Sequence, residues 1–345
     1  MSTAQSPVSQ LLERNLSLFA GKRLLVAGFW EDDYLCTLAA ETAATTLLCT
    51  DFHRYRQLQA CSAPSTLVTL FDHALPAQSD RFDALLLCLP KAKRETEYLL
   101  ASLAPWLTAG ADLFLAGENR GGINSADRFL APYADATHKI DSARRCSLVH
   151  AALSKPVAAF ELDAWVQSYP LTHGAQSLQI LALPGVFSAN ELDEGTALLL
   201  DHLPPLSGRV LDLGCGAGVI GALLAARQPD LQVELCDINA LALESARRTL
   251  AANGLSGQVF ASDMLSAVQG PLNAVITNPP FHAGLNTLYA PTEQMIREVP
   301  TRLAPGGQLW LVANAFLRYP PHLDAVFQQQ QVVAENRRFR VYQAH

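Results

Sequence analysis

The chain contains 345 residues, more than one ordinary hydrophobic core accommodates, so we expect two domains. Half of the residues are hydrophobic and 17% are charged, a composition that excludes a disordered chain. No run approaches the roughly 20 apolar residues of a membrane span, and residues 1–14 lack the apolar core of a signal peptide. The seven cysteines form no C-x-x-C pair, so we expect a cytoplasmic protein without disulfides or a metal.

Charge is distributed unequally along the chain. The formal net charge is −7, which taken alone disfavours binding to nucleic-acid phosphates. Residues 1–155 contain 15 lysines and arginines against 16 acidic residues, whereas residues 156–345 contain 10 against 16 and no lysine. A surface that binds a polyanion is therefore expected to include the first part of the chain.

Short leucine-rich or β-branched runs alternate with longer helical patterns, which is typical of βαβ units around a parallel sheet. The strands expected in the first half are Lys22–Gly28, a run ending at Asp51, Asp83–Lys91, Ala109–Asn119 and Ser142–Ala151. Those expected in the second half are Arg209–Gly214, Gln232–Asp237, Ala274–Thr277 and Gln308–Ala313. A helix closed by a glycine is expected over Ala242–Gly254.

The second half of the chain repeats the plan of the first. The offset is 186 residues from Gly28 to Gly214, and again from Asp51 to Asp237. Three later matches follow in the same order, with offsets of 190, 196 and about 193 residues. Parallel α/β units look alike in general, but five ordered matches with so little drift favour a duplicated domain.

We therefore expect two tandem Rossmann-like α/β domains. The first copy comprises residues 1–155, the second comprises residues 191–345, and residues 156–190 form a linker and lead-in segment. The copies differ in chemistry, because the second has Asn-Pro-Pro-Phe at 278–281 where the first has Cys-Leu-Pro-Lys at 88–91. The first copy is thus expected to bind or support, and the second to catalyse.

In the second copy a buried strand runs directly into a glycine-rich turn. Gly214, Gly216 and Gly218 let the backbone turn tightly and let a ligand lie against it. The dinucleotide fingerprint G-x-G-x-x-G also fits this stretch. Asp212 disfavours a dinucleotide, because a carboxylate suits a cationic ligand, such as the ammonium group of methionine, better than a pyrophosphate. The first copy has Val26 at this position.

Carboxylates also follow the next two strands of the second copy. Asp237 ends one strand, where it can accept hydrogen bonds from both hydroxyls of a ribose. Asp263, followed by Met264, comes after the next strand and can accept from the amino group of an adenine. Either acid alone is also compatible with a solvated loop, but ligands of open α/β sheets bind at such strand ends.

The tetrapeptide 278–281 supplies the chemistry for methylating an aromatic amine, whose lone pair is delocalised into the ring. If the Asn278 side-chain oxygen and the Pro279 carbonyl each accept one N–H, the nitrogen lone pair turns toward a methyl donor. The two prolines stiffen the backbone that aims the carbonyl, and Phe281 can stack on the base after it leaves its helix. Catalysis would then rest on orientation and electrostatics.

The cysteines and histidines of the chain are weaker candidates for a catalytic role. Methylation of carbon 5 of a pyrimidine needs a cysteine nucleophile, and 277–284 contains none. Cys215 in the glycine turn is interpreted as a small buried residue. His282 can touch the target but more often such a loop histidine is solvated, and His173 receives no role.

The stretches described above resemble the cofactor motifs of the class I S-adenosylmethionine-dependent methyltransferases. The resemblance implies two tandem class I methyltransferase domains with a degenerate first copy and a catalytic second copy. It implies that Asn278, Pro279 and Phe281 are catalytic and that Pro280 and Phe281 contact the substrate. The residues implied to bind S-adenosylmethionine are Asp212, Gly214, Cys215, Gly216, Gly218, Asp237, Ile238, Asp263, Met264 and Asn278.

A longer set of motifs resembles the bacterial guanine-N(2) methyltransferases of 16S ribosomal RNA. The motifs are GENRGGI at 117–123, DSARRC at 141–146, PGVFS at 184–188, LDEGTALLL at 192–200, and DLGCGAGVIG, LAANG, NPPFHAG, VANAFLRYP and RRFRVY further on. That family also has a degenerate N-terminal copy, so the resemblance covers essentially the whole chain. It implies guanine-1207 of 16S RNA, in the 30S subunit, as the target.

RNA binding needs clustered cations, but the net charge of the chain is −7. Only local basic clusters are therefore available, and such clusters can also be merely solvated. The residues expected to contact RNA are Lys91, Lys93, Arg94, Arg144 and Arg145. Further candidates are Arg120 and the cluster Arg337, Arg338 and Arg340.

Two alternatives stay open beside a monomeric 16S RNA methyltransferase. One is methylation of another amine, on a 23S RNA guanine, a DNA adenine or a protein glutamine. The other is a non-catalytic RNA-binding assembly factor that keeps the cofactor fold. The presence of Asp212, Asp237 and Asn278 disfavours the second alternative, because a pure binder does not need all three.

Overall fold

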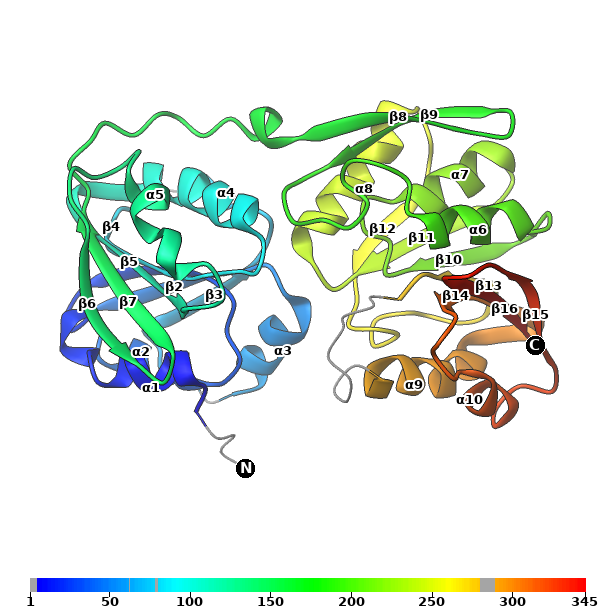
Figure 1. Ribbon diagram of the computed structural model, residues 1–345, viewed down its shortest axis with the longest axis horizontal. Coiled ribbons are helices and arrows are strands. Elements are labelled where there is room, and N and C mark those ends of the chain that lie inside the picture. The colour runs from blue at the N-terminus through cyan, green and yellow to red at the C-terminus, as the bar shows by residue number, and fades with distance from the viewer. Residues whose placement is uncertain (1–4, 62, 78–79, 280–288) are drawn as a thin grey trace. The chain divides into compact units, whose positions relative to one another are not determined.

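The protein is seen here as a computed structural model, described over residues 5–61, 63–77, 80–279 and 289–345 (Figure 1). The chain divides into two compact units, Met1–Trp165 and Val166–His345. In the part of the chain that the structure describes, no helix is long and apolar enough to cross a membrane. All seven cysteines are free thiols.

The first unit contains a seven-stranded sheet with the strand order β3-β2-β1-β4-β5-β7-β6. Its strands are β1 (Arg23–Gly28), β2 (Ala44–Cys49), β3 (Leu67–Phe71), β4 (Phe82–Cys88), β5 (Leu107–Glu118), β6 (His138–Ala143) and β7 (Cys146–Ala152). Its α-helices are α1 (Pro7–Glu13), α2 (Tyr34–Ala40), α3 (Phe52–Ala60), α4 (Lys93–Leu103) and α5 (Ala126–Leu130). Strands β1 to β5 pair in parallel, and β7 runs antiparallel to its neighbours β5 and β6.

The second unit contains a sheet with the order β12-β11-β10-β13-β14-β16-β15 and the separate hairpin β8–β9. Its strands are β8 (Gln167–His173), β9 (Gln176–Ala182), β10 (Arg209–Leu213), β11 (Gln232–Asp237), β12 (Gln258–Ala261), β13 (Leu272–Thr277), β14 (Leu303–Asn314), β15 (Gln330–Glu335) and β16 (Phe339–Ala344). Its α-helices are α6 (Glu194–His202), α7 (Val219–Arg227), α8 (Ala240–Ala252), α9 (Tyr289–Glu298) and α10 (Pro320–Asp324). Here β16 is the antiparallel strand.

The two large sheets have the same strand order and the same directions. Even single backbone contacts recur, because the Asn119 N–H donates to the Arg145 carbonyl and the Ala315 N–H donates to the Arg338 carbonyl, each over 2.7 Å. This shared topology confirms the predicted pair of Rossmann-like domains. It also explains the drifting offset, since the strands match one for one while the connecting segments differ in length.

The central strands are rich in buried apolar residues, as expected for parallel sheets that are covered on both faces. Val26 in β1 and Val210 and Leu211 in β10 are fully buried. Helix α7 is buried from Val219 to Ala225, as expected for a helix without a polar face, and it contacts β9, β11 and α8. The sequence thus places the end of β10 and the start of α7 inside a rigid core.

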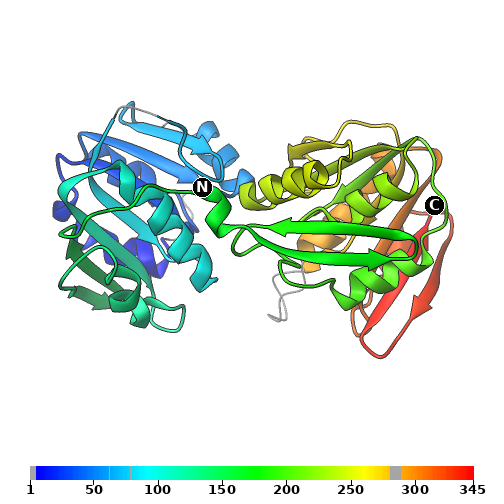
Figure 2. The same cartoon turned by 90° about the horizontal axis from the view of Figure 1, so that it is seen from above.

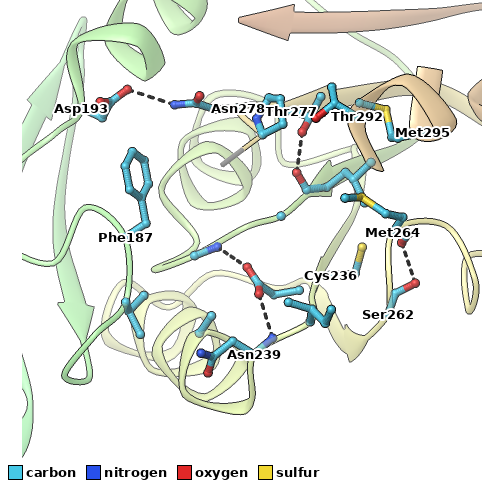
Figure 3. A pocket seen from close by; sticks show the side chains of 18 of the residues that line it. Phe187, Asp193, Cys236, Asn239, Ser262, Met264, Thr277, Asn278, Thr292 and Met295 are labelled. Atoms are coloured by element: carbon cyan, nitrogen blue, oxygen red, sulfur yellow. Dashed lines mark hydrogen bonds between the residues drawn. The ribbon is translucent and has the colours of Figure 1, made fainter. Parts of the chain in front are cut away.

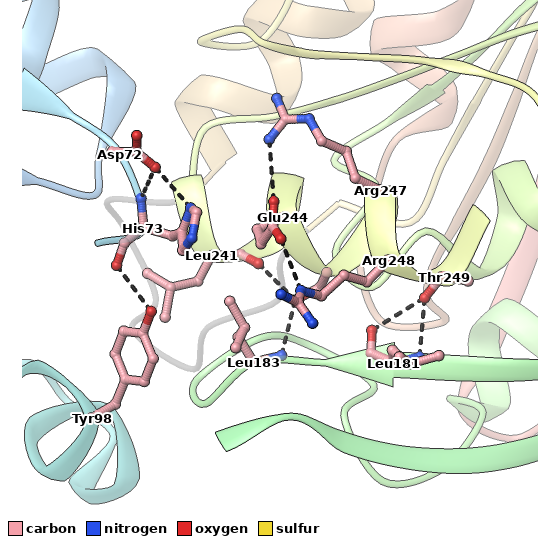
Figure 4. Close-up of polar contacts among 11 residues, drawn as sticks. Asp72, His73, Tyr98, Leu181, Leu183, Leu241, Glu244, Arg247, Arg248 and Thr249 are labelled. Atoms are coloured by element: carbon pink, nitrogen blue, oxygen red, sulfur yellow. Dashed lines mark hydrogen bonds and ion pairs between the residues drawn. The ribbon is translucent and has the colours of Figure 1, made fainter. Parts of the chain in front are cut away.

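The hairpin β8–β9 lies within residues 156–190, for which we expected a linker and lead-in segment. It runs along the helices of the second unit (Figure 2), where β9 contacts α7 and α8. The Leu181 N–H donates to the Thr249 hydroxyl over 3.0 Å, and the Leu183 N–H donates to the Ser245 hydroxyl over 2.9 Å (Figure 4). Helix α8 is thereby held from this side before the chain reaches α6.

Candidate active site

A cavity of about 650 Å³ opens at the carboxyl ends of β10, β11 and β13 (Figure 3). The strand order reverses between β10 and β13, which is where open α/β sheets bind ligands. All the residues that line the cavity belong to the second unit. Of the predicted cofactor residues, those that line it are Gly214, Gly216, Asp237, Ile238, Asp263, Met264 and Asn278.

The glycine turn shapes one wall of this cavity. The Gly214 and Cys215 N–H groups both donate to the Cys236 carbonyl, over 2.9 and 3.0 Å, so the chain turns over β11 as it leaves β10. Gly214 has a φ of +73°, and a Cβ added there would meet no atom within 4 Å. Gly218 serves packing instead, because its added Cβ would lie 3.0 Å from Ala246 of α8. A ligand can therefore lie against the backbone at Gly214.

The Asp237 carboxylate is fixed by backbone donors at the edge of the cavity. One oxygen accepts from the Gly216 N–H and the other from the Asn239 N–H, each over 2.9 Å. A carboxylate offers about four lone-pair sites, so a group held in this way suits a ligand that donates hydrogen bonds. In the next loop the Ser262 hydroxyl donates to the Met264 carbonyl over 2.7 Å, and Met264 lines the cavity in a left-handed conformation, with φ +47°.

Asp212 and Cys215 lie below the cavity wall and do not line it. Asp212 is fully buried, and one carboxylate oxygen accepts from the Gly221 N–H over 2.8 Å. Its other oxygen has no hydrogen-bond partner within the described ranges. Burial raises the pKa of Asp212 to about 7 and raises the pKa of the Cys215 thiol well above its ordinary value. Asp212 thus positions the start of α7, and its contact with an ammonium group stays a prediction.

Asn278 stands at the end of β13, which is tied to β10 by a 2.8 Å hydrogen bond from the Thr277 hydroxyl to the Leu213 carbonyl. The Asn278 Nδ2 group donates to Asp193 over 2.9 Å and to the Thr196 hydroxyl over 2.8 Å. The Asn278 Oδ1 atom is buried and has no partner among the described residues. Pro279 also lines the cavity. The predicted roles of Pro280, Phe281 and His282 fall outside the described residues.

Several residues of the site were not singled out from the sequence. Asp193 and Phe187 line the cavity beside Asn278 (Figure 3), and the Phe187 side chain is 56% exposed. Arg338, which the sequence suggested only as a candidate RNA contact, also lines the cavity and forms a 2.6 Å ion pair with Glu194. The available signals were the motifs PGVFS and LDEGT, which contain Phe187, Asp193 and Glu194 but were used only for resemblance.

The first-named RNA contacts, at Lys91, Lys93, Arg94, Arg144 and Arg145, lie in the first unit and do not line the cavity, whereas the further candidate Arg338 lies in the second unit and lines it. Lys91, Lys93 and Arg94 are exposed at and just before the start of α4. Arg144 and Arg145 form the exposed two-residue turn between β6 and β7, with φ values of +49° and +65°. Such values are uncommon outside glycine, asparagine and aspartate. The chain therefore accepts backbone strain where it presents these two cations.

The end of β1 in the first unit is built differently. Gly28 has a φ of +94°, and a Cβ added there would lie 1.8 Å from the Cys88 carbonyl oxygen. The Phe29 N–H donates to the same oxygen over 2.9 Å, so the chain stays paired with β4. Asp51, the counterpart of Asp237, instead caps α3 by accepting from the Arg54 N–H over 2.9 Å. These contacts leave the first unit without the cofactor turn.

The site of the second unit fits S-adenosylmethionine. Gly214 leaves open space for a ligand, and Asp237 is held where it can bind a ribose. Asn278 lines the same cavity, and its buried Oδ1 atom has no partner among the described residues. In the described ranges no group of three or more His, Cys, Asp or Glu residues is placed to hold a metal ion. The fold and the cavity define a class I S-adenosylmethionine-dependent methyltransferase.

Comparison with known proteins specifies the class. The family models "Methyltransferase small domain N-terminal" and "Methyltransferase small domain" match residues 9–169 and 177–343. The chain is 56% identical to the ribosomal RNA small subunit methyltransferase C of Aeromonas hydrophila over 342 residues, covering 99% of both chains. It is 43% identical to the Vibrio cholerae protein of the same name over 336 residues, 97% of both chains. The chain belongs to the ribosomal RNA small subunit methyltransferase C family.

A solved structure agrees with this assignment. The 16S rRNA N2 guanine-1207 methyltransferase of T. thermophilus, in complex with AdoMet and guanosine, superimposes with a TM-score of 0.85 at 25% identity. The alignment covers 99% of this chain and 92% of that chain. Both units are therefore shared with a structure that binds the cofactor and a guanine nucleoside.

Proposed function

We propose that this protein transfers a methyl group from S-adenosylmethionine to the exocyclic N(2) amine of a guanine in 16S ribosomal RNA, guanine-1207 by similarity, in the 30S subunit. The observation that carries the proposal is that Asn278 lines the cofactor cavity while its buried Oδ1 atom has no partner in the part of the chain that the structure describes. Leaving a buried acceptor unpaired costs about 1–3 kcal/mol, so a ligand donor is the natural partner for it.

The residues of the chain act mainly by orientation. Asn278 Oδ1 accepts one N–H of the target amine, and the Pro279 carbonyl is predicted to accept the other. Both hydrogen bonds strengthen as the nitrogen gains positive charge, so they stabilise the transition state more than the bound substrate. When bound, S-adenosylmethionine supplies an electrophilic methyl group on a sulfonium ion, so that an N–CH3 bond replaces the S–CH3 bond, a neutral thioether leaves, and the amine releases one proton to water.

The cofactor is held by the other strand ends. Asp237 would bind the ribose hydroxyls, and Ile238 and Met264, which also line the cavity, would cover the adenine. Asp263 would accept from the adenine amino group. Gly214 and Gly216, which line the cavity near the buried Asp212 carboxylate, would hold the methionyl end. Because a nucleophilic thiol requires a lowered pKa, the raised pKa of Cys215 supports a packing role for this residue.

The first unit is proposed to bind the RNA backbone. Lys91, Lys93 and Arg94 provide exposed cations at the start of α4. The strained turn at Arg144 and Arg145 supports the same role, because strained backbone tends to persist where it serves function. We propose that the protein acts as a monomer and, because it acts on ribosomal RNA, in the cytoplasm.

The test is methyl transfer with labelled S-adenosylmethionine and separate acceptors. The acceptors are naked 16S RNA, small subunits, large subunits, duplex DNA and a peptide release factor. Label confined to small-subunit RNA, located at the guanine N(2) by nucleoside analysis, is the expected result. Label in DNA, protein or large subunits points to another amine methyltransferase, and no label in any acceptor points to an assembly factor.

A further inference from the structure

We infer that Asp193 and Thr196 are positioning residues that hold the Asn278 amide in the single orientation that presents its oxygen to the target amine. The inference rests on the proposed function and concerns the same site. Asp193 lies 85 residues before Asn278 in the sequence, yet their side chains meet beside the cavity (Figure 3).

The three side chains form a closed hydrogen-bonded triangle. One oxygen of Asp193 accepts from the Asn278 Nδ2 group over 2.9 Å and from the Thr196 hydroxyl over 3.3 Å. The Thr196 hydroxyl oxygen in turn accepts from the Asn278 Nδ2 group over 2.8 Å. Both N–H bonds of the Asn278 amide are therefore used within the triangle.

The direction of these bonds follows from the chemistry of the carboxylate. An ionised aspartate only accepts, so the Thr196 proton points to Asp193 and the Thr196 lone pair is left for Asn278. If the Asn278 amide flipped, its oxygen would face the Asp193 carboxylate at the position where Nδ2 now lies 2.9 Å away. Two acceptors without a proton between them repel each other. The flipped amide would also turn N–H donors toward the N–H donors of the target.

The triangle is anchored to a rigid part of the second unit. Asp193 is the N-cap of α6, and the same oxygen accepts from the Thr196 N–H over 2.9 Å. A Cβ added at Gly195, which directly precedes Thr196, would lie 2.9 Å from the Phe339 ring, so the start of α6 is packed closely on β16. Thr196 is only 4% exposed. The anchor thus cannot easily follow a rotation of the Asn278 amide.

The experiment must separate this role from helix capping. Asp193→Ser keeps a good N-cap residue but shortens the side chain that reaches Asn278, whereas Asp193→Asn keeps an oxygen of the same reach. Thr196→Val keeps the shape and the Asp193 cap but removes one acceptor. For each full-length variant we would measure the single-turnover rate on small subunits, the dissociation constant for S-adenosylmethionine, and the melting temperature. The same substitutions would be repeated in an Asn278→Ala background.

Asp193→Ser should lower the single-turnover rate about ten- to hundredfold, as expected when a reacting group is misoriented. Thr196→Val should have a smaller effect in the same direction, and Asp193→Asn should recover most of the rate. Cofactor affinity should stay within about twofold. In the Asn278→Ala background neither substitution should lower the rate further, because residues that act as a unit are not additive.

Two results would overturn the inference. One is a normal rate for both Asp193→Ser and Thr196→Val in a wild-type background. The other is an equal loss with and without Asn278, which shows a structural role independent of it. If Asp193→Ser fails to fold, Thr196→Val alone decides between these outcomes. Failure of the proposed function is recognised separately, because the wild-type protein would then not label small-subunit RNA at all.

Discussion

The two units share a strand order, yet the chain leaves their equivalent first strands in opposite directions. After Gly28 it stays paired with β4, through the hydrogen bond from the Phe29 N–H to the Cys88 carbonyl. After Gly214 it turns over β11, where the Cys236 carbonyl accepts two N–H groups. Both positions need glycine, but for different reasons. One is packed against a neighbouring backbone and the other faces a cavity.

This difference shows that the interactions that stabilise the fold are distinct from those that form the cofactor cavity. Buried apolar strands hold both sheets together, and they tolerate Val26 in one unit where Asp212 stands in the other. The cavity depends instead on a few backbone directions and polar groups at strand ends. A duplicated unit can lose these groups without losing its fold, and its surface is then available for another task.

The largest expected difference between the two units is the effect on turnover of replacing Asn278 or its counterpart Cys88. Asn278→Ala should lower turnover about a hundred- to thousandfold, or about 2.7–4 kcal/mol, the usual loss for one preorganised hydrogen-bonding group. Because the bond strengthens in the transition state, kcat should fall more than substrate binding weakens. Steady-state kinetics with saturating cofactor would measure this, with Cys88→Ala at the equivalent position of the first unit as the control. Normal turnover of Asn278→Ala would show that this segment is only a turn.

A second test compares the paired aspartates. Asp237→Ala should weaken binding of S-adenosylmethionine about ten- to hundredfold, since hydrogen bonds to a charged group contribute about 1.5–3 kcal/mol. Turnover should largely recover at saturating cofactor. Asp51→Ala should leave cofactor affinity unchanged and lower only the melting temperature, because Asp51 caps α3. Calorimetric titration of both variants decides; equal losses of affinity would place a cofactor site in the first unit as well.

A third test concerns Asp212, whose pKa burial raises to about 7. Between about pH 4, the unfolded pKa, and pH 7 the folded protein binds more protons than the unfolded chain. Its unfolding free energy should therefore fall as the pH rises through this window. Asp212→Asn keeps an acceptor for the Gly221 N–H and should remove this slope, which would raise stability at pH 8 by about 1–2 kcal/mol.

The same variant tests the predicted role of the Asp212 charge. If the carboxylate attracts the ammonium group of the cofactor, Asp212→Asn should bind S-adenosylmethionine more weakly although it is more stable. Denaturant unfolding at pH 5 and pH 8, together with cofactor titration, gives both quantities. Unchanged affinity would mean that Asp212 only positions α7.

The smallest expected effect tests which unit holds the RNA. Neutralising Lys91, Lys93 and Arg94 together should reduce the slope of log affinity against log salt by about one for each lost phosphate contact. Cofactor affinity should not change, because these residues do not line the cavity. The matched variant neutralises Arg337, Arg338 and Arg340 in the second unit. If only that variant flattens the slope, the RNA contacts belong to the second unit.

Much of the fold could be predicted because its signals are local. The strand expected at Gln232–Asp237 is β11 as observed, and the expected helix Ala242–Gly254 corresponds to α8, which begins two residues earlier behind the Asn239 cap. Internal repetition predicted the second sheet from the first. The hairpin β8–β9 lacked such a signal, because its strands are only partly buried and have no counterpart in the first unit.

The site was predictable where chemistry and spacing coincide within one motif. Asp237 and Asn278 follow strands directly, and both line the cavity. Asp193 could not be assigned in this way, because Asp-Glu-Gly-Thr before an apolar run is also an ordinary helix start. Its contact with Asn278 depends on packing between residues far apart in sequence. Nor could the sequence show that Asp212 lies under the wall, since depth depends on the turn above it.

The close approach of Gly28 to the Cys88 carbonyl oxygen also bears on evolutionary reversal. Restoring an aspartate at Val26 and an asparagine at Cys88 would return the lost functional groups to the first unit. The backbone there would still follow β4, and its N–H groups would still be engaged away from any cofactor. Recovery of activity would need the whole segment between β1 and α2 to be rebuilt at once. Single point mutations in this unit would therefore not create a catalytic site, because the side chains and the backbone would have to change together.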